Sequence, residues 1–124
     1  MTLQLSVAQL NFTVGDMAGN AHKIIQAARD AHARGVRLLI TPELSICGYA
    51  AEDLFLRPSF IDACLKAVDQ VREAVADLPG MHVVVGHPSG DDQRTRSVSV
   101  QHRFNMASVS VSYTHLTLPT KRIV

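Results

Sequence analysis

Residues 36–44 read Val36-Arg37-Leu38-Leu39-Ile40-Thr41-Pro42-Glu43-Leu44, an apolar run that ends in a proline and a carboxylate. The run is aliphatic enough to form a central strand of a parallel sheet. Pro42 ends this strand because it has no N–H to donate to the ladder. Glu43 is therefore expected at the carboxyl edge of the sheet, where α/β proteins bind ligands, and is placed there to act as a base.

Apolar strands and amphipathic helices alternate along the first 88 residues. The pattern predicts strands over residues 3–9, 36–41 and 81–85, and helices over residues 21–34 and from residue 58 to residue 78. Asn20 is the expected N-cap of the first helix, and Gly35 fits the position just past its end. Gly86-His87-Pro88 is expected to close the third strand. Strands and helices in this order imply right-handed crossovers, a largely parallel sheet and an α/β fold class.

The last third of the chain has a weaker pattern. Residues 89–96 are polar and charged and predict a turn between strands, while residues 98–100 and 103–109 predict a hairpin or a fourth strand. Residues 110–124 are rich in hydroxyl side chains and show no clear period. Their β propensity would permit a ragged strand.

Composition narrows the class of protein. The chain has 124 residues, enough for one domain, of which 47% are hydrophobic and 19% charged. A net charge of +1 and an aromatic content of 5% argue against nucleic acid or an anionic membrane as a partner. No apolar run approaches the ~20 residues of a membrane span. The N-terminus is not that of a secretory signal, and two cysteines do not make a disulfide framework, so we expect a cytoplasmic protein.

Other chemistry-bearing residues give no second site. The histidines lack zinc-site spacing, so no metal is expected, and neither G-x-G-x-x-G nor a P-loop is present. Cys47 could pair with Glu43 as thiol and carboxylate, but cysteine is more often a small buried hydrophobe. Cys64 lies on the apolar stripe of the second helix and is expected in the core. Tyr49 lies on the same loop as Glu43, and either lines a substrate pocket or packs.

Several short segments across residues 3–109, taken in order, resemble the opening of the nitrilase (carbon–nitrogen hydrolase) superfamily. They are Val7-Ala8-Gln9-Leu10-Asn11, Val14-Gly15-Asp16, Gly19-Asn20, Thr41-Pro42-Glu43-Leu44, Val83-Val84-Val85-Gly86-His87-Pro88 and Phe104-Asn105-Met106-Ala107-Ser108-Val109. Residues 48–60, GYAAEDLFLRPSF, more narrowly resemble the glutaminase domain of glutamine-dependent NAD⁺ synthetases. Phe104 stands where that family usually has tyrosine.

The resemblance implies a four-layer α-β-β-α sandwich, only partly encoded here, and a catalytic trio of Glu, Lys and Cys. Glu43 matches the family's general base. The nucleophilic Cys and the catalytic Lys are expected beyond this chain, because neither Cys47 nor Cys64 matches the nucleophile and Lys121 stands in an unmatched tail. We therefore expect the chain by itself to be inactive.

Residues 110–124 depart from the family pattern. They resemble a tail that recurs on unrelated chains through sequencing-adapter sequence, so we expect a non-native tail. The expected organisation is residues 1–109 as the N-terminal part of a glutaminase domain, followed by the tail at residues 110–124. A third interpretation takes the tail as genuine and the chain as a truncated pseudoenzyme.

For the parent protein, the resemblance implies hydrolysis of glutamine and transfer of the ammonia to a synthetase domain that amidates deamido-NAD⁺. The glutaminase part would need no cofactor, and the synthetase domain would need ATP and Mg²⁺. A homo-oligomer is expected. Two alternatives stay open: a stand-alone amidase or carbamoylase of the same superfamily, and a non-catalytic α/β interaction module.

Overall fold

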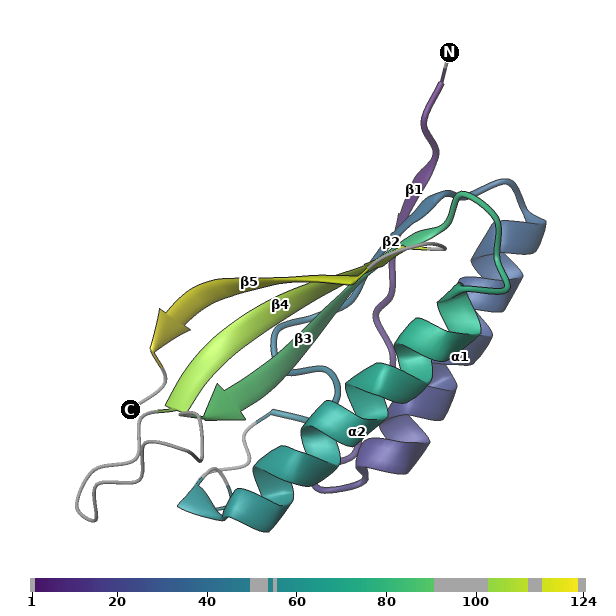
Figure 1. Cartoon of the computed structure of the whole chain (residues 1–124). Coiled ribbons are helices and arrows are strands. Elements are labelled where there is room, and N and C mark those ends of the chain that lie inside the picture. Colours follow the sequence, from purple (N-terminus) through teal and green to yellow (C-terminus); the bar gives the residue numbers. More distant parts are fainter. Residues whose placement is uncertain (1, 50–53, 55, 91–102, 112–114, 123–124) are drawn as a thin grey trace.

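The computed structural model describes residues 2–49, 54, 56–90, 103–111 and 115–122, which form one sheet and two helices (Figure 1). The elements in chain order are β1 (Leu5–Val7), α1 (Met17–Ala33), β2 (Leu38–Ile40), α2 (Pro58–Val75), β3 (His82–Gly90), β4 (Arg103–Val111) and β5 (His115–Arg122). The predicted α/β fold class is confirmed. Neither helix is long and apolar enough to cross a lipid bilayer.

The sheet has five strands in the order β1-β2-β3-β4-β5. β1, β2 and β3 are parallel, with Leu39 opposite both Ser6 and Val83. β3–β4 and β4–β5 are antiparallel, so the expected largely parallel sheet is found only in its first three strands. The connection between β3 and β4, residues 91–102, lies outside the described residues.

β3 is longer than its sequence predicts. The prediction that Gly86-His87-Pro88 ends this strand is wrong. The strand continues to Gly90, with Pro88 opposite Asn105. β2 ends opposite Val84, so the second half of β3 borders only β4. A proline is tolerated where one side of a strand has no neighbouring strand, because its missing N–H then leaves no inter-strand hydrogen bond unmade. The predicted strand over residues 103–109 is confirmed as β4, whereas the turn beyond Gly90 and the strand over 98–100 lie outside the described residues.

α1 begins earlier than expected, and its N-cap is Asp16 rather than Asn20. An oxygen of the Asp16 carboxylate accepts a hydrogen bond from Gly19 N at 3.0 Å, and the helix begins at Met17. A carboxylate at this position satisfies one of the otherwise unpaired N–H groups of the first turn. Asn20 lies inside the first turn and is buried. Gly35 has the expected place after the helix, with φ +90° and its N–H donating to His32 O.

Both helices present the apolar stripes that their periodicity predicts. Pro58 occupies the first turn of α2, where its missing N–H costs nothing. The buried stripes are Ile24, Ala28 and Ala31 on α1, and Ile61, Cys64, Val68, Val71 and Val75 on α2. α1 packs against α2, and α2 packs against β3 and β4.

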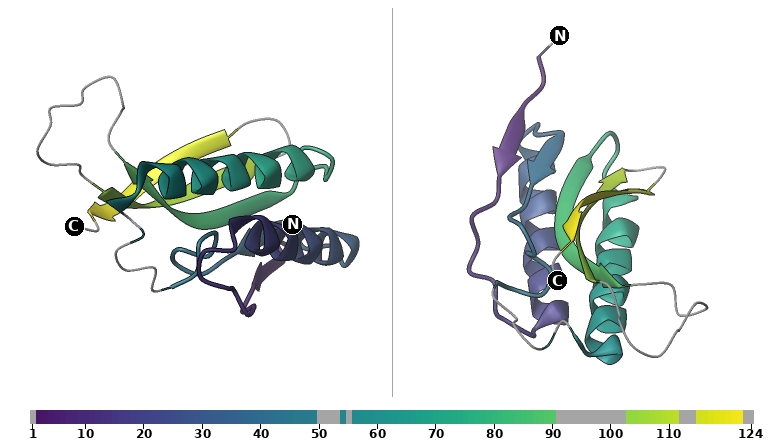
Figure 2. Two further views of the ribbon diagram at one scale, coloured as in Figure 1. Left: turned by 90° about the horizontal axis from the view of Figure 1, so that it is seen from below. Right: turned by 90° about the vertical axis from the view of Figure 1, so that its left-hand side faces the viewer.

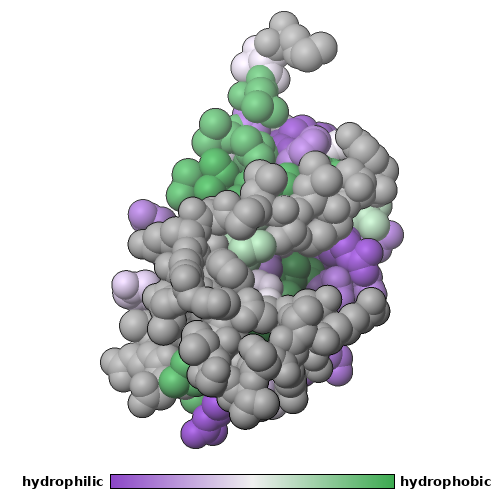
Figure 3. Space-filling model, turned by 60° about the vertical axis from the view of Figure 1, so that its left-hand side comes forward, coloured by the Kyte–Doolittle hydropathy of each residue, from purple (hydrophilic) through white to green (hydrophobic). Residues whose placement is uncertain are grey.

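The two helices lie on one face of the sheet, so Figure 2 (right) looks past the strands to the helices behind. On the helix side, Leu39, Val83 and Val85 are 0–1% exposed. On the opposite face, Leu5 and Val7 are 56% and 59% exposed, in register with Leu38, Ile40 and Val84. This second set of side chains is called the open face below, and part of it is seen in Figure 3. One helical layer and one sheet match the expectation of a partial four-layer sandwich.

Candidate active site

The loop at residues 41–48, called the Glu43 loop below, leaves the carboxyl end of β2 and is fastened to β3. Thr41 N and Thr41 Oγ1 both donate to Val84 O, at 3.0 and 2.8 Å. Gly86 N donates to Thr41 Oγ1 at 3.4 Å. Ser45 Oγ lies 2.8 Å from Thr41 Oγ1 and donates to Gly86 O at 3.3 Å. These bonds join the loop that follows β2 to the neighbouring strand β3.

Gly86 allows the backbone of the Glu43 loop to lie directly against β3. A Cβ atom added at Gly86 would stand 2.4 Å from Pro42 O and 2.6 Å from Leu44 N. Any side chain there would push the loop away from the sheet. The glycine is therefore required for space, and it brings β3 against the two neighbours of Glu43.

Asn20 holds the Glu43 loop from the helix side. Its Nδ2 donates to Ile46 O at 3.0 Å and to Thr13 O at 2.8 Å, and its Oδ1 accepts from Thr13 N at 2.8 Å. Gly15 N adds a bond to Cys47 O at 2.9 Å. Asn20 is 0% exposed, its bond to Ile46 O is buried, and its two bonds to Thr13 are part-buried.

Glu43 and its neighbour Pro42 are exposed, whereas the Glu43 loop is buried from Leu44 to Gly48. Leu44, Ile46 and Cys47 are 3%, 0% and 0% exposed, whereas Glu43 is exposed. Leu44 has φ +55°, a left-handed conformation that costs a residue with a Cβ about 1–2 kcal/mol. The surrounding anchors maintain this conformation, which turns the chain so that Leu44 enters the core and its neighbour stays outside.

The other predicted residues of the loop have contrasting positions. Tyr49 is 75% exposed, so it does not pack in the core of this chain, and its contact with a substrate stays a prediction. Cys47 is the small buried hydrophobe of the two alternatives, with Sγ 3.6 Å from Leu44 O and 3.5 Å from Gly48 O. Cys64 is in the core, as expected.

Comparison with known proteins identifies the family. A model of the carbon–nitrogen hydrolase family matches residues 4–100. The chain belongs to this carbon–nitrogen hydrolase family. It is 41% identical over 92 residues to a glutamine-dependent NAD(+) synthetase of Synechocystis sp., an alignment that covers 74% of this chain. The chain spans only 16% of the length of that relative, so it corresponds to a small part of the relative.

Solved structures show the same carbon–nitrogen hydrolase fold. The glutamine-dependent NAD⁺ synthetase of Acinetobacter baumannii, in complex with ADP, superposes with a TM-score of 0.73 at 26% identity, covering 94% of this chain and 20% of that one. An amidase of Nesterenkonia sp. gives the same TM-score at 22% identity, covering 96% of this chain and 42% of the amidase. The likeness to the amidase shows a shared fold and no more.

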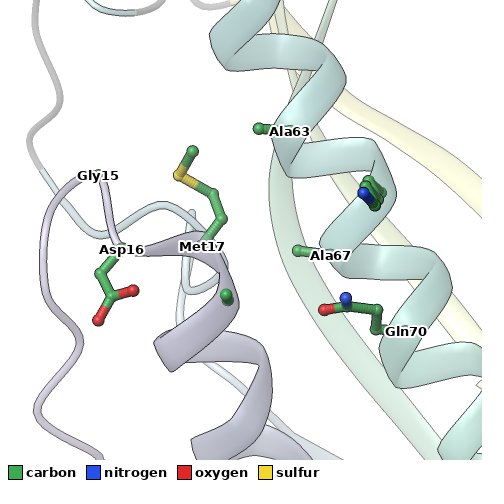
Figure 4. A pocket seen from close by; sticks show the side chains of 8 residues that line it. Gly15, Asp16, Met17, Ala63, Ala67 and Gln70 are labelled. Carbon is green, nitrogen blue, oxygen red and sulfur yellow. The ribbon is translucent and has the colours of Figure 1, made fainter.

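This member of the carbon–nitrogen hydrolase family also has a depression of about 330 Å³ on its helical side. It lies between the start of α1 and the middle of α2 (Figure 4). Its lining residues are Gly15, Asp16, Met17, Ala18, Ala63, Lys66, Ala67 and Gln70. Neither Glu43 nor Tyr49 lines it, so this depression is separate from the candidate active site.

The sequence did not predict how the Glu43 loop is held. Two signals were present: Gly86 follows three valines, which is typical of a close backbone approach, and Thr41 and Ser45 are hydroxyl side chains within an apolar stretch. The role of Asn20 was hidden by its position near a helix start, which favours a capping interpretation. Glu52 and Asp53, the other acidic residues close to the loop in the sequence, lie outside the described residues. The described residues contain no group of three or more metal-ligating side chains.

Proposed function

We propose that residues 1–109 are the N-terminal part of a glutaminase domain, and that Glu43 is its general base. The observation that carries this proposal is an exposed carboxylate at the carboxyl edge of the parallel strands, on a loop that is anchored to β3 and to α1. A base must keep its geometry through the reaction, and a loop anchored on both sides provides it. Glu43 lies within residues 4–100, which match the family model, and in the Thr41-Pro42-Glu43-Leu44 segment that resembles the family, and both support the same role.

In the proposed reaction, Glu43 takes the proton of a cysteine thiol supplied by residues beyond this chain. The thiolate attacks the side-chain carboxamide carbon of glutamine, Glu43 gives its proton to the departing nitrogen, ammonia leaves, and a thioester remains. A lysine, also beyond this chain, stabilises the negative charge on the carbonyl oxygen. Glu43 then removes a proton from the water that hydrolyses the thioester. Tyr49, exposed on the same loop, is the proposed contact for the substrate.

The whole protein is proposed to be a glutamine-hydrolysing NAD⁺ synthase. Its second domain would use the ammonia, with ATP and Mg²⁺, to amidate deamido-NAD⁺, and the residues that bind ATP would lie outside this chain. The NAD(+) synthetase name of the Synechocystis relative supports this branch. We further propose a homo-oligomer that works in the cytoplasm. A stand-alone amidase is less favoured, because the resemblance to the amidase is one of fold alone. A non-catalytic interaction module is less favoured, because the Synechocystis relative is named as a synthetase.

A chimaera tests the branch of the family. Residues 1–109 replace the matching segment of the Synechocystis relative, and NAD⁺ formation from deamido-NAD⁺ is measured with glutamine and, separately, with ammonium as nitrogen source. We expect activity with both. A chimaera that uses ammonium but not glutamine has a working synthetase domain and a segment unfit for glutaminase chemistry, which contradicts the proposal. Residues 1–124 alone are expected to release no ammonia from glutamine.

A further inference from the structure

A pair of buried hydroxyl groups closes the turn that carries Glu43. Thr41 Oγ1 and Ser45 Oγ lie 2.8 Å apart, and the two residues are 6% and 1% exposed. They stand four positions apart, with Glu43 midway between them in the sequence. The bond therefore joins the two ends of a short turn whose middle residue is exposed.

The two hydroxyls have fewer protons than contacts that need one. Each hydroxyl has a single proton to donate. Thr41 Oγ1 lies 2.8 Å from Val84 O. Ser45 Oγ lies 3.3 Å from Gly86 O and 2.8 Å from the Thr41 hydroxyl. Because two protons serve three contacts, the direction of one hydroxyl depends on the other, and the two form a single unit.

The contact distances favour one direction through this unit. Hydroxyl hydrogen bonds are most often about 2.7–2.8 Å long. Two contacts of 2.8 Å form a chain in which Ser45 donates to Thr41 and Thr41 donates to Val84 O. Donation from Ser45 to Gly86 O, at 3.3 Å, is the weaker use of the same proton. Thr41 Oγ1 is therefore the central atom of the chain, and it also accepts from Gly86 N at 3.4 Å.

The turn between the two hydroxyls contains a strained residue. Leu44 has φ +55°, in the left-handed region that is unfavourable for a residue with a Cβ atom. Leu44 directly follows Glu43, so its relaxation would also turn the backbone that carries the carboxylate. The bond between Thr41 and Ser45 spans this strained residue and opposes its relaxation.

We propose that Thr41 and Ser45 are positioning residues for the general base, with Thr41 the more important of the two. The inference rests on the proposed function of Glu43 and adds the side chains that keep its carboxylate in place. A displacement of about 1 Å can lower a catalytic rate about 10²-fold. Loss of the pair should lower kcat and change KM little, because substrate still binds while the base is out of place.

Thr41→Val tests this role, since valine has nearly the shape of threonine and lacks the hydroxyl. The variant is made in the chimaera that carries residues 1–109, and ammonia release from glutamine is measured. We expect kcat to fall about 10- to 10²-fold, with KM little changed. Thr41→Ser, which retains a hydroxyl, should keep most of the original kcat. An unchanged kcat in Thr41→Val, or an equal fall in Thr41→Ser, would overturn the proposal.

Ser45→Ala and the double variant test the direction of the hydrogen-bond chain. Because Thr41 makes the bond to Val84 O, Ser45→Ala should lower kcat less than Thr41→Val does. Adding Ser45→Ala to Thr41→Val should then lower kcat little further, since the chain is already broken. Fully multiplicative effects would contradict the single unit, and a larger effect of Ser45→Ala would contradict the direction. Ser45→Ala also tests the role of the pair if Thr41→Val fails to fold.

Two controls separate this inference from loss of stability and from the proposed function. Ser108→Ala removes a buried hydroxyl that lies 2.6 Å from His87 Nε2, between β4 and β3, and should leave kcat unchanged. NAD⁺ formation from ammonium should be the same in all variants. If Glu43→Gln lowers kcat and Thr41→Val does not, only this inference fails. If Glu43→Gln has no effect, the proposed function fails and this inference fails with it.

Amide hydrogen exchange of residues 1–124 tests the positioning without any enzyme activity. Mass spectrometry of the Thr41→Val chain should show faster exchange in peptides that cover residues 41–48 than in the original chain. Peptides from α2 should exchange at the same rate in both chains. Equal exchange of residues 41–48 in the two chains would overturn the proposal.

Discussion

Asn20 shows how one buried side chain positions a loop that it does not belong to. Its carboxamide joins the start of α1, the segment around Thr13 and the Glu43 loop through three hydrogen bonds. A carboxamide can donate two hydrogen bonds while it accepts another, whereas a hydroxyl has only one proton to donate and an ionised carboxylate has none. The orientation of Glu43 therefore depends on a residue that lies 23 positions away in the sequence.

Asn20→Ala should destabilise the chain. The substitution removes the partner of the buried Ile46 O and of the part-buried Thr13 N and Thr13 O, which costs about 1–3 kcal/mol of unfolding free energy. Urea denaturation measures the loss. The exposed Asn11 provides the matched control, since Asn11→Ala should change the free energy by about 0.5 kcal/mol or less. Equal effects of the two substitutions would show that the Asn20 network does not hold the loop.

At the scale of elements, the helices contribute stability through one buried stripe each. Ile24→Ala on α1 removes a side chain that is 0% exposed and should cost about 2–5 kcal/mol. Leu65→Ala on α2 removes one that is 38% exposed and should cost about 1 kcal/mol or less. Urea denaturation of both variants tests the difference, and a larger loss for Leu65→Ala would contradict the packing described here.

Local patterns predicted the elements of this chain better than their boundaries. The helical periodicity correctly placed the stripes ending at Ala31 and Val75, because those positions respond to one continuous core. The cap of α1 and the end of β3 were predicted wrongly, since Asn20 is used by a distant loop and Pro88 lies where β3 has lost one neighbour. Glu43 was assigned from its motif and its place after a strand, but the bonds that hold its loop are tertiary. The division between residues 109 and 110 stays a prediction.

At the scale of the whole molecule, the open face of the sheet leaves apolar side chains of β1 exposed. The family resemblance places a second sheet against this face, and the present chain leaves Leu5 and Val7 more than half exposed. Exposed apolar side chains in register across several strands favour self-association. We therefore expect residues 1–124 to be poorly soluble.

Replacing Leu5 and Val7 together by threonine should reduce this association. Threonine keeps the β propensity of the strand and removes much of its apolar surface. Size-exclusion chromatography with light scattering should show a larger monomer fraction than for the original chain. Leu65→Gln, on a helix away from the open face, serves as control and should change the monomer fraction little. An unchanged monomer fraction in the double variant would place the association elsewhere.

If the Glu43 carboxylate is the general base, its replacement should slow ammonia release from glutamine. In the chimaera with the Synechocystis relative, Glu43→Gln should lower kcat about 10²- to 10⁴-fold, the contribution typical of a general base. Glu73→Gln, an exposed glutamate on α2, is the matched control and should leave kcat unchanged. NAD⁺ formation from ammonium should be the same in both variants. Unaltered ammonia release from glutamine in the Glu43→Gln chimaera would show that Glu43 is not the base.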